Sequence, residues 1–490
     1  MTSALEESVW RLMHEALDLY HDSPPAADQL RHHLSRFDEP LRIAVAGPWQ
    51  AGKSTLVNAI VGEEVAPIEA PDAEQVFTWY QDGPEPHATA YPAGVELPVA
   101  RTANGLRVDI RRWRPAPVND LVVTWPSRAL RNATIVDTPA LPAHNFDPRA
   151  SQGGSTRSAS GDKVLRDADA VLYLTRDGRG TDLEWLESAQ DGTVARAAPV
   201  NVILVLSRAD EIGGGRIDAL LAAKQLARKH HRDHHVGSLC LAVVALGGLV
   251  ALAGRVLSDD NFAALSTMAR TSRPELEPYL LTTDRFVGED FPAPVDAQTR
   301  EDLLDRLGIF GVRLATTLIR TGSGTDTRAG LAAELVRRSG LSELREAVGR
   351  CFVDRADALK ARSALAALES VLRDEPRPGS DKLLADLEHT LTNAHDFREL
   401  RLVAALQGHR VKFGTDLEAE ARRLVGEGGT STAARLGVDR RTNPGQLWEL
   451  ATEALRRWQE QSEDPLLSLE QRRAAAVVVR SCEGILHALS

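Results

Sequence analysis

The chain has 490 residues, enough for two or three domains, and its content of 43% hydrophobic and 26% charged residues is that of a folded protein, which excludes a single small module and a wholly disordered chain. A formal net charge of -11 means that the chain as a whole repels phosphate backbones, so we expect no nucleic-acid partner. The three cysteines lie far apart and form no CxxC pair, which predicts a reducing, cytoplasmic location.

The N-terminal segment predicts an amphipathic helix. Apolar residues between Leu5 and Tyr20 recur at helical spacing, so they form one face that must pack against another part of the chain. Glu6 and Glu7 stand where a secretion signal would carry basic residues, and we therefore expect no cleaved leader.

Apolar runs of strand length alternate with polar helical segments from Leu41 to about Leu246. The alternation predicts a mostly parallel sheet covered by helices, the α/β class. Between residues 74 and 125, shorter runs and glycine-containing turns predict an antiparallel hairpin at the edge of that sheet. The main runs are 41–46, 134–137, 170–174, 200–206 and 239–246.

The clearest motif directly follows the first of these strands. Residues 47–54 read Gly-Pro-Trp-Gln-Ala-Gly-Lys-Ser, which satisfies GxxxxGK[ST], the phosphate loop of nucleotide-binding proteins. The glycines allow the tight turn, the backbone amides face a β-phosphate, the lysine bridges the β- and γ-phosphates, and the serine hydroxyl takes a place in a Mg²⁺ shell. The nucleotide-binding residues predicted here are Gly47, Gln50, Ala51, Gly52, Lys53, Ser54 and Thr55.

A second element, Asp137-Thr138-Pro139-Ala140, closes the strand at 134–137. Asp137 would hold Mg²⁺ through a water molecule. GTPases usually read DxxG at this place, whereas this chain has Ala140, whose methyl group restricts the backbone where it should pivot towards the γ-phosphate. We therefore expect the Ala140 amide to contact the nucleotide and the switching movement to be weakened.

A third element, Ser207-Arg208-Ala209-Asp210, ends the strand at 200–206 and predicts guanine as the base. The Asp210 carboxylate can accept from both N1–H and the 2-amino group of guanine, a donor pair that adenine lacks. GTPases usually read [NT]KxD here; Arg208 can lie along the base as the lysine does, and Ser207 is a shorter version of threonine.

The stretch from Val236 to Gly254 carries no charge and is nearly long enough to span a bilayer. Glycines interrupt it, so a buried strand followed by a turn and a helix is the favoured interpretation over a membrane span.

After about Arg255 the strand pattern ends and long helical patterns follow. One apolar face begins at Leu341 and extends towards Leu372, which predicts a helix of stalk length. A turn at 373–381 then leads into a second helix, and further helices are predicted at 400–424, 446–460 and 467–489. The loop at 373–382, whose net charge is zero, has two interpretations. A plain interhelical turn is favoured, and the alternative is a trunk tip that contacts lipid through Arg373, Arg377 and Lys382.

The order of these motifs, with a helical C-terminal half, resembles the bacterial dynamin-like GTPases, and in particular their isoniazid-inducible group in mycobacteria and other actinobacteria. The resemblance implies an α/β phosphate-loop GTPase domain at 38–255, N-terminal helices at 1–37 that pack on a bundle, and a helical neck or trunk at 256–490. It also implies GTP, GDP and Mg²⁺ as ligands, homo-oligomers or hetero-oligomers with a paralogue, and peripheral contact with lipid at the inner face of the cell membrane. The runs that carry the likeness are 40–47, 51–59, 78–80, 207–213 and 332–335.

The departures from the family pattern leave two functional hypotheses open. Relatives place a threonine in the first switch where this chain has Glu74, and a carboxylate facing a γ-phosphate is repulsive unless a metal intervenes. The first hypothesis is a GTPase that hydrolyses slowly and remodels membranes, with Gln50, Lys53 and Asp137 as catalytic residues. The second is a GTP-binding scaffold that does not hydrolyse and complements an active paralogue. Weak switches favour the second, and the intact phosphate loop predicts binding in both.

Overall fold

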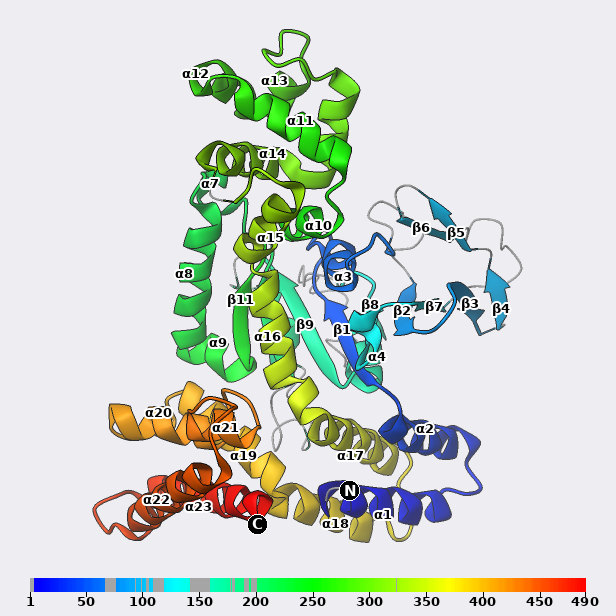
Figure 1. Ribbon diagram of the computed structural model, residues 1–490. Coiled ribbons are helices and arrows are strands. Elements are labelled where there is room, and N and C mark those ends of the chain that lie inside the picture. Colours follow the sequence, from blue (N-terminus) through cyan, green and yellow to red (C-terminus); the bar gives the residue numbers. More distant parts are fainter. Residues whose placement is uncertain are drawn as a thin grey trace.

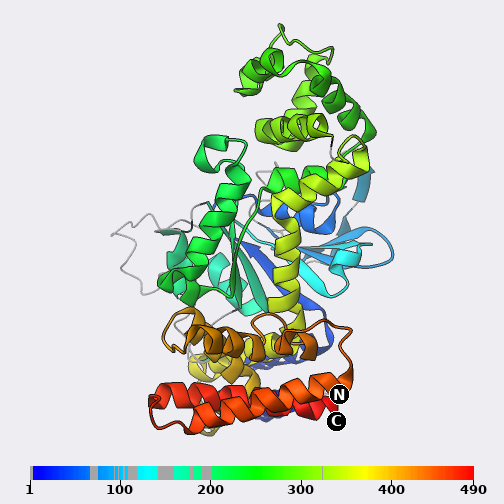
Figure 2. The same cartoon turned by 60° about the vertical axis from the view of Figure 1, so that its left-hand side comes forward.

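The computed structural model describes residues 4–66, 76–92, 94–97, 99–102, 105–108, 119–141, 159–176, 178, 181–188, 194, 201–322 and 324–490. A twisted sheet lies in the middle of the molecule, and groups of helices lie above and below it (Figure 1). The same layers are seen after a turn of the molecule, with the helix α16 (Leu341–Cys351) running alongside the sheet between the two groups (Figure 2).

Within the described residues the central sheet has nine strands, and five neighbouring strands run parallel to one another. Their order, β11-β10-β9-β1-β8, places β1, which precedes the phosphate loop, between two parallel neighbours. Every residue of β9 and β10 is buried, as expected for strands covered on both faces. These strands span Leu41–Ala46 (β1), Ala133–Asp137 (β8), Ala170–Thr175 (β9), Val202–Leu206 (β10) and Ala242–Ala245 (β11).

The edge predicted as an antiparallel hairpin is built differently. Strands β2 (Phe77–Asp82) and β7 (Asp120–Trp125) pair in parallel, so the prediction of an antiparallel pair is wrong. The antiparallel partner of β2 is β8, and β7 lies between β2 and β3 (His87–Tyr91). The turn after β2 does reverse the chain, but a strand from further along the sequence occupies the place beside it. The edge ends with β4 (Val95–Leu97), and β5 (Val99–Thr102) and β6 (Gly105–Val108) form a separate pair.

Helices cover both faces of the sheet (Figure 1). The uncharged stretch at 236–254 forms the end of one helix, β11 and most of the next helix. Among the residues that the structure describes, no helix combines the length and the apolar character that a bilayer span requires. The helices around the sheet are α3 (Lys53–Val61), α4 (Ala159–Asp167), α5 (Thr181–Ser188), α7 (Ile212–Gly215), α8 (Ala219–Arg232), α9 (His234–Leu239) and α10 (Gly248–Val256).

The upper helical group follows α10 directly, so the helices of 256–490 occupy both ends of the sheet (Figure 1). The long helix α14 packs on α11 and α10, and its chain turns sharply at Gly308, where φ is 65°. The group comprises α11 (Asp259–Arg270), α12 (Arg273–Leu276), α13 (Thr283–Val287), α14 (Ala297–Thr321) and α15 (Arg328–Ser339).

The stalk-length helix predicted from Leu341 to Leu372 is broken. Helix α16 ends at Cys351, and α17 (Ala356–Asp374) begins after a short 3-10 turn. Phe352 is fully buried at this break, so packing at the junction overrides the continuous apolar pattern. The prediction for 400–424 is corrected in the same way, because α19 (His395–Gln407) and α20 (Thr415–Leu424) are separate helices joined through Gly408 and Gly414.

The lower helical group combines both ends of the chain. Val9 and Met13 of α1 are fully buried, and α1 packs on α17 and α18. The turn between α17 and α18 is an interhelical turn, as favoured above: Arg377 lies over the ring of Tyr20 and pairs with Asp22 and Glu375. The group comprises α1 (Ala4–Leu19), α2 (Pro24–Ser35), α17, α18 (Ser380–Asn393), α19, α20, α21 (Thr432–Leu436), α22 (Pro444–Glu463) and α23 (Leu469–Leu489).

Candidate nucleotide-binding site

The phosphate loop connects β1 to α3 in a conformation that requires its glycines. Gly47 has a φ of 150°, and a Cβ there would lie 2.5 Å from the carbonyl oxygen of Leu174 in β9. Gly52 is left-handed, with a φ of 89°, and immediately precedes the first residue of α3. Gln50 also has a positive φ, 57°. The loop therefore wraps closely against the strand ends, and it leads directly into the N-terminus of α3, the end of a helix that favours anions.

Lys53 and Ser54 begin α3, and both hold partners that belong to the site. The Lys53 Nζ donates to the carbonyl oxygens of Gly47 and Pro48, at 3.4 and 3.2 Å. The Ser54 Oγ donates to Asp137 Oδ2 at 2.7 Å. Burial raises the pKa of Asp137 to about 6, against the opposing effects of the Ser54 hydrogen bond and the Lys53 charge. The two predicted Mg²⁺ ligands, the Ser54 hydroxyl and the Asp137 carboxylate, are thus hydrogen-bonded to each other. Oxygen ligands of this kind suit Mg²⁺.

The segment 137–141 is fastened to β1 and to the phosphate loop. The Thr138 hydroxyl donates to the carbonyl of Val45 at 2.9 Å, and the Leu141 amide donates to the carbonyl of Gly47 at 3.1 Å. Ala140 lies between these two anchors, beside the loop. Glu74, the departure in the first switch, lies outside the described residues.

The guanine motif lies at the end of β10 and reaches back to the phosphate loop. The Ser207 hydroxyl is buried and donates to the carbonyl of Thr175 at 3.1 Å, so it joins the ends of β9 and β10. The Arg208 guanidinium donates to the carbonyl of Gln50 at 3.2 and 3.1 Å and to Glu211 at 2.7 Å. Burial raises the pKa of Asp210.

Two glycines that sequence reasoning did not single out as site residues border this motif. A Cβ on Gly247 would lie 2.9 Å from a methyl group of Leu220 and 3.6 Å from Asp210 Oδ1, and one on Gly248 would lie 3.3 Å from the methyl group of Thr55. The first amides of a helix have no partner within the helix, and no side chain caps the start of α10 at Gly248. The Gly-Gly pair after an apolar strand was the available signal.

The structure brings the predicted site residues together at the carboxyl ends of β1, β8, β10 and β11, where ligands bind in open α/β sheets. Direct hydrogen bonds join Ser54 to Asp137 and Arg208 to Gln50. Thr55 lies next to Gly248 and Asp210 next to Gly247, both at the start of α10, and Ala51 is buried.

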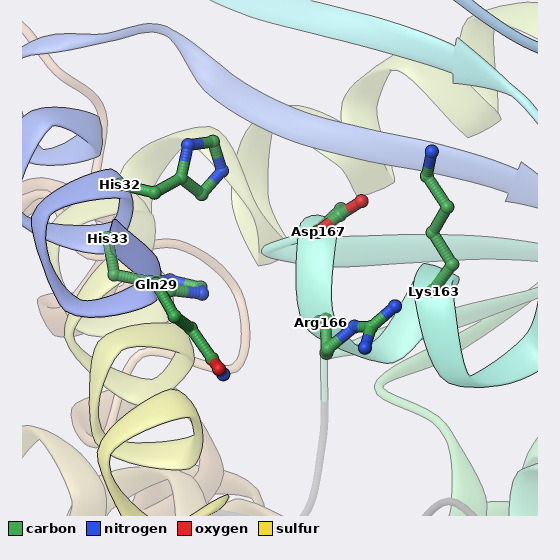
Figure 3. Close-up of a pocket in the computed structure, with 6 residues that line it drawn as sticks. All are labelled: Gln29, His32, His33, Lys163, Arg166 and Asp167. Carbon is green, nitrogen blue, oxygen red and sulfur yellow. The ribbon is translucent and has the colours of Figure 1, made fainter. Parts of the chain in front are cut away.

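A cavity of about 280 Å³ lies elsewhere, between α2 and α4, near the amino ends of β1 and β9. Figure 3 shows His32, His33 and Gln29 of α2 facing Arg166 and Asp167 of α4 across it. A second cavity, of about 560 Å³, is lined by the C-terminal half of α8. Neither lining includes a residue of the phosphate loop, so we separate both cavities from the nucleotide site.

The fold and this site define the class of phosphate-loop GTPase domains, here with helical groups attached. No family model matches the chain. Its sequence is 38% identical over 488 residues to the isoniazid-induced protein IniC of Mycobacterium tuberculosis, in strains CDC 1551 and H37Rv alike, and the alignment covers 98% of this chain and 98% of that protein. The chain therefore belongs to the IniC family of dynamin-like proteins.

Two more distant likenesses accompany that relationship. The tRNA modification GTPase MnmE of Halorhodospira halophila is 24% identical over 233 residues, which are 47% of this chain and 38% of that protein. The other likeness is to a solved structure of an oligomerised bacterial dynamin pair. The match covers 99% of this chain and 74% of the matched chain, at 14% identity and a TM-score of 0.29.

Proposed function

We propose that this protein binds GTP and GDP together with Mg²⁺ and hydrolyses GTP slowly. The observation that carries the proposal is that Lys53 and the Ser54–Asp137 pair lie at one loop, to which Arg208 of the guanine motif is hydrogen-bonded. Lys53 would leave the two loop carbonyls for the β- and γ-phosphates, which offer it stronger, charge-assisted partners. The amides from Gln50 to Thr55 would surround the β-phosphate.

Mg²⁺ would be held by the Ser54 hydroxyl directly and by Asp137 through water. The ion would neutralise charge on the β- and γ-phosphates when bound. Asp137 must be ionised to accept from the metal's water, and the neighbouring cation would favour that form over the neutral one. Gln50 would donate an amide hydrogen bond between the same phosphates.

Guanine would be selected by Asp210, which can accept from N1–H and the 2-amino group at once. Arg208 would lie along the base, as its planar cation allows, and Ser207 would hold the strand end in place. The first amides of α10, next to Asp210, offer donors to a carbonyl oxygen on the base. The relative named as a GTPase supports guanine over adenine.

A second candidate, a GTP-binding scaffold without hydrolysis, is favoured by one observation. Thr138 and Leu141, on either side of Ala140, are both hydrogen-bonded to β1 or the phosphate loop. A pivot of this segment would break those bonds and strain a residue that bears a side chain. This arrangement supports slow or absent turnover.

Family membership supports the remaining parts of the proposal. We place the GTPase domain at 38–255, N-terminal helices at 1–37 and a helical trunk at 256–490. We propose that the protein is cytoplasmic and contacts the inner face of the membrane peripherally. It would couple its nucleotide state to membrane remodelling, either as a homo-oligomer or together with a dynamin-like paralogue.

The test is calorimetric titration of GTP, GDP and ATP in magnesium buffer. We expect GTP and GDP to bind, ATP to bind at least a hundredfold more weakly, and Lys53→Ala to abolish binding. Lys382→Ala, which removes an exposed lysine far from the loop, is the matched control and should bind as wild type does. Undiminished binding by Lys53→Ala would refute the site.

A phosphate-release assay then separates the two candidates. Slow release of phosphate that rises when vesicles are added supports the enzyme. Tight binding with no phosphate released supports the scaffold.

A further inference from the structure

The cavity between α2 and α4 has polar walls that the proposed nucleotide site does not use. Its volume is about 280 Å³, and Figure 3 shows the lining residues of α2 on one side of the space and those of α4 on the other. The lower helical group and the helical cover of the sheet meet here, and we call this space the α2–α4 cavity. Its lining comprises Gln29, His32, His33, Lys163, Arg166 and Asp167.

His33 extends an unused hydrogen-bond donor into this space. Its side chain is 3% exposed, and its Nδ1 lies 3.2 Å from Arg36 Nη1. Because arginine can only donate, Nδ1 accepts and the ring proton is on Nε2. In the part of the chain that the structure describes, Nε2 has no hydrogen-bond partner. So enclosed a donor is rarely left without a partner, and a ligand in the cavity would supply one.

His32 offers a second donor of the same kind. Its Nε2 lies 3.1 Å from Arg42 Nη1, so Nε2 accepts and Nδ1 carries the proton. The rings of His32 and His33 meet edge to face, with their centroids 5.5 Å apart. Two arginines thus fix the tautomers of two neighbouring imidazoles, and each ring keeps one N–H group for a further acceptor.

Three other lining side chains are also available to a ligand. Within the described ranges, Gln29, Arg166 and Asp167 make no side-chain hydrogen bond or ion pair. Lys163 differs, because its ammonium is paired with Asp120 at 2.6 Å and lies over the ring of Phe77. The positive charge that the lining offers to a ligand is therefore that of Arg166, and the free carboxylate is that of Asp167.

Arg36 holds the two walls of the cavity together. Its guanidinium bonds to His33 in α2, to the carbonyl oxygen of Arg166 in α4 at 3.4 Å, and to buried Asp169 at the start of β9. The donors of the cavity therefore stand on a frame that is fixed by buried charges. A ligand that binds there orders little of the protein, which favours affinity.

Two histidines and a carboxylate are also common ligands of a metal ion. Among the residues that the structure describes, no three such side chains are placed to hold one. The lone pairs of His33 Nδ1 and His32 Nε2 already accept from arginines, and the remaining ring nitrogens are protonated and cannot coordinate a metal. The cavity therefore favours a ligand rich in acceptor oxygens.

The larger cavity along α8 shows why charge alone does not select a site. Its volume is about 560 Å³, and three of its lining residues, Arg228, Lys229 and Arg232, are exposed cations. The other two, Gln225 and Asp233, are exposed as well, and all five come from α8 or the residue that follows it. It carries more positive charge than the α2–α4 cavity, but none of these described lining residues is a buried donor.

We propose that the α2–α4 cavity is a second ligand site, separate from the nucleotide site, which binds a small phosphate monoester that carries hydroxyl groups, as sugar phosphates do. The phosphate oxygens would accept from Arg166 and His33. A hydroxyl group would donate to Asp167, whose charge repels the phosphate itself. The volume lies near the lower end for small-molecule sites, about 300 Å³, so the ligand is smaller than a nucleoside triphosphate.

The test is calorimetric titration of full-length Lys53→Ala, in which the phosphate loop lacks its lysine, with glucose 6-phosphate, inorganic phosphate and glucose as probes. We expect glucose 6-phosphate to bind at one site, inorganic phosphate to bind roughly tenfold more weakly because it lacks the hydroxyl contact to a charged group, and glucose not to bind measurably. Wild type saturated with GDP and Mg²⁺ repeats the titration with the loop occupied. No binding of glucose 6-phosphate to either protein overturns the inference, and equal affinity for inorganic phosphate overturns the sugar-phosphate class.

Variants of α4 locate the site. Arg166→Gln removes one charge-assisted bond and should weaken glucose 6-phosphate binding at least roughly tenfold. Asp167→Asn should bring the affinities for glucose 6-phosphate and inorganic phosphate closer together, because Asp167 is what favours the hydroxyl-bearing ligand. The matched control is Arg228→Gln/Arg232→Gln, which removes two cations from the α8 cavity and should leave binding unchanged.

Thermal unfolding gives a second readout and checks folding. Glucose 6-phosphate should raise the unfolding midpoint of wild type and of Lys53→Ala, since a ligand of the folded chain adds stability, and should leave that of Arg166→Gln unchanged. Without ligand, Arg166→Gln should unfold at the wild-type midpoint. Binding that survives in Arg166→Gln but is lost in the α8 double variant overturns the inference. Absence of GTP binding by wild type would overturn the proposed function instead, because glucose 6-phosphate is also titrated into a chain without Lys53.

Discussion

The polar groups at the carboxyl ends of the parallel strands are held differently from those at the amino ends. We call these two sides of the sheet the carboxyl edge and the amino edge. At the carboxyl edge, Lys53 is bonded to two carbonyls of its own loop and Ser54 to Asp137. At the amino edge, Asp169 at the start of β9 is 1% exposed and accepts from the Arg36 guanidinium and from the Arg42 amide at 2.9 Å. The bonds of Lys53 stay within the phosphate loop. The Ser54–Asp137 bond and the bonds of Asp169 join separate parts of the chain.

Asp169 is the meeting point of three regions. Arg36, 3% exposed, arrives from the turn after α2, and Arg42 belongs to β1. Arg362 of α17 is also buried; burial lowers its pKa to about 10, and the charge of Asp169 opposes that effect. We call this set the charged joint. Its charges are buried and interact with one another, whereas phosphate oxygens can replace the two carbonyl partners of Lys53. The difference shows where the molecule is built to stay fixed and where it is built to bind.

The sharpest test of the comparison removes the centre of the charged joint. Asp169→Asn keeps the shape but removes the buried charge that pairs with Arg36 and acts on Arg362. Breaking a buried pair in this way costs about 3–5 kcal/mol of unfolding free energy. Urea denaturation followed by circular dichroism measures it.

The matched control is Asp28→Asn. Its ion pair with Arg31 is exposed on both sides, and exposed pairs contribute about 0–1 kcal/mol. If both variants lost the same stability, the amino edge would be no more fixed than the surface.

Local patterns explain how much of the nucleotide site could be predicted from sequence. The phosphate loop could be predicted because residues 47–54 are consecutive. Its glycines allow the backbone angles of the loop, and its lysine and serine supply the groups that contact the phosphates and Mg²⁺. Asp137 and Asp210 could be placed because parallel strands end at one edge. The motif alone could not show that Arg208 would reach the carbonyl of Gln50, 158 positions earlier.

Long-range packing explains what the sequence left open. Asp169 and Arg36 are 133 positions apart, and each reads as an ordinary charged residue in its own segment. The pattern from Leu341 to Leu372 is continuous, yet the buried side chain of Phe352 sits where the helix breaks. Strand β7 enters beside β2 from about forty positions downstream, and no local turn encodes that pairing.

Asn58 tests whether the binding edge also contains a fixed element. It is fully buried on α3, and its side chain accepts from the amides of Val65 and Ala66 at 2.8 and 2.7 Å and donates to the Ala66 carbonyl at 2.8 Å. Asn58→Ala would leave buried backbone groups unpaired. We expect a loss of about 3 kcal/mol and faster hydrogen exchange at both amides.

Asn393→Ala, which removes an exposed side-chain hydrogen bond to Arg398, is the control and should change stability by under about 0.5 kcal/mol. Unchanged exchange at Val65 and Ala66 in Asn58→Ala would mean that the turn after α3 holds itself.

The smallest expected effect is a pH dependence at the amino edge, beside the cavity of Figure 3. His33 is 3% exposed, and its Nδ1 lies 3.2 Å from Arg36 Nη1. A guanidinium only donates, so this nitrogen must accept and the ring is neutral. Burial, and next the charge of Arg36, lower the pKa of His33 to about 2, with smaller contributions from His32 and Arg42.

Because the folded pKa lies below the unfolded value of 6.5, the unfolded chain takes up this proton first as the pH falls. Stability from His33 is complete above pH 6.5 and is lost below it, by about 2 kcal/mol between pH 6.5 and pH 5. His33→Gln should flatten that part of a pH series of urea midpoints. Burial also lowers the pKa of His32, so His32→Gln should flatten it less. Glu399, whose pKa is lowered to about 2, acts only below its ordinary value of 4.5 and leaves this window clear. An equal slope in wild type and His33→Gln would show that the ring is protonated in the folded protein, and that the charged joint tolerates a further cation.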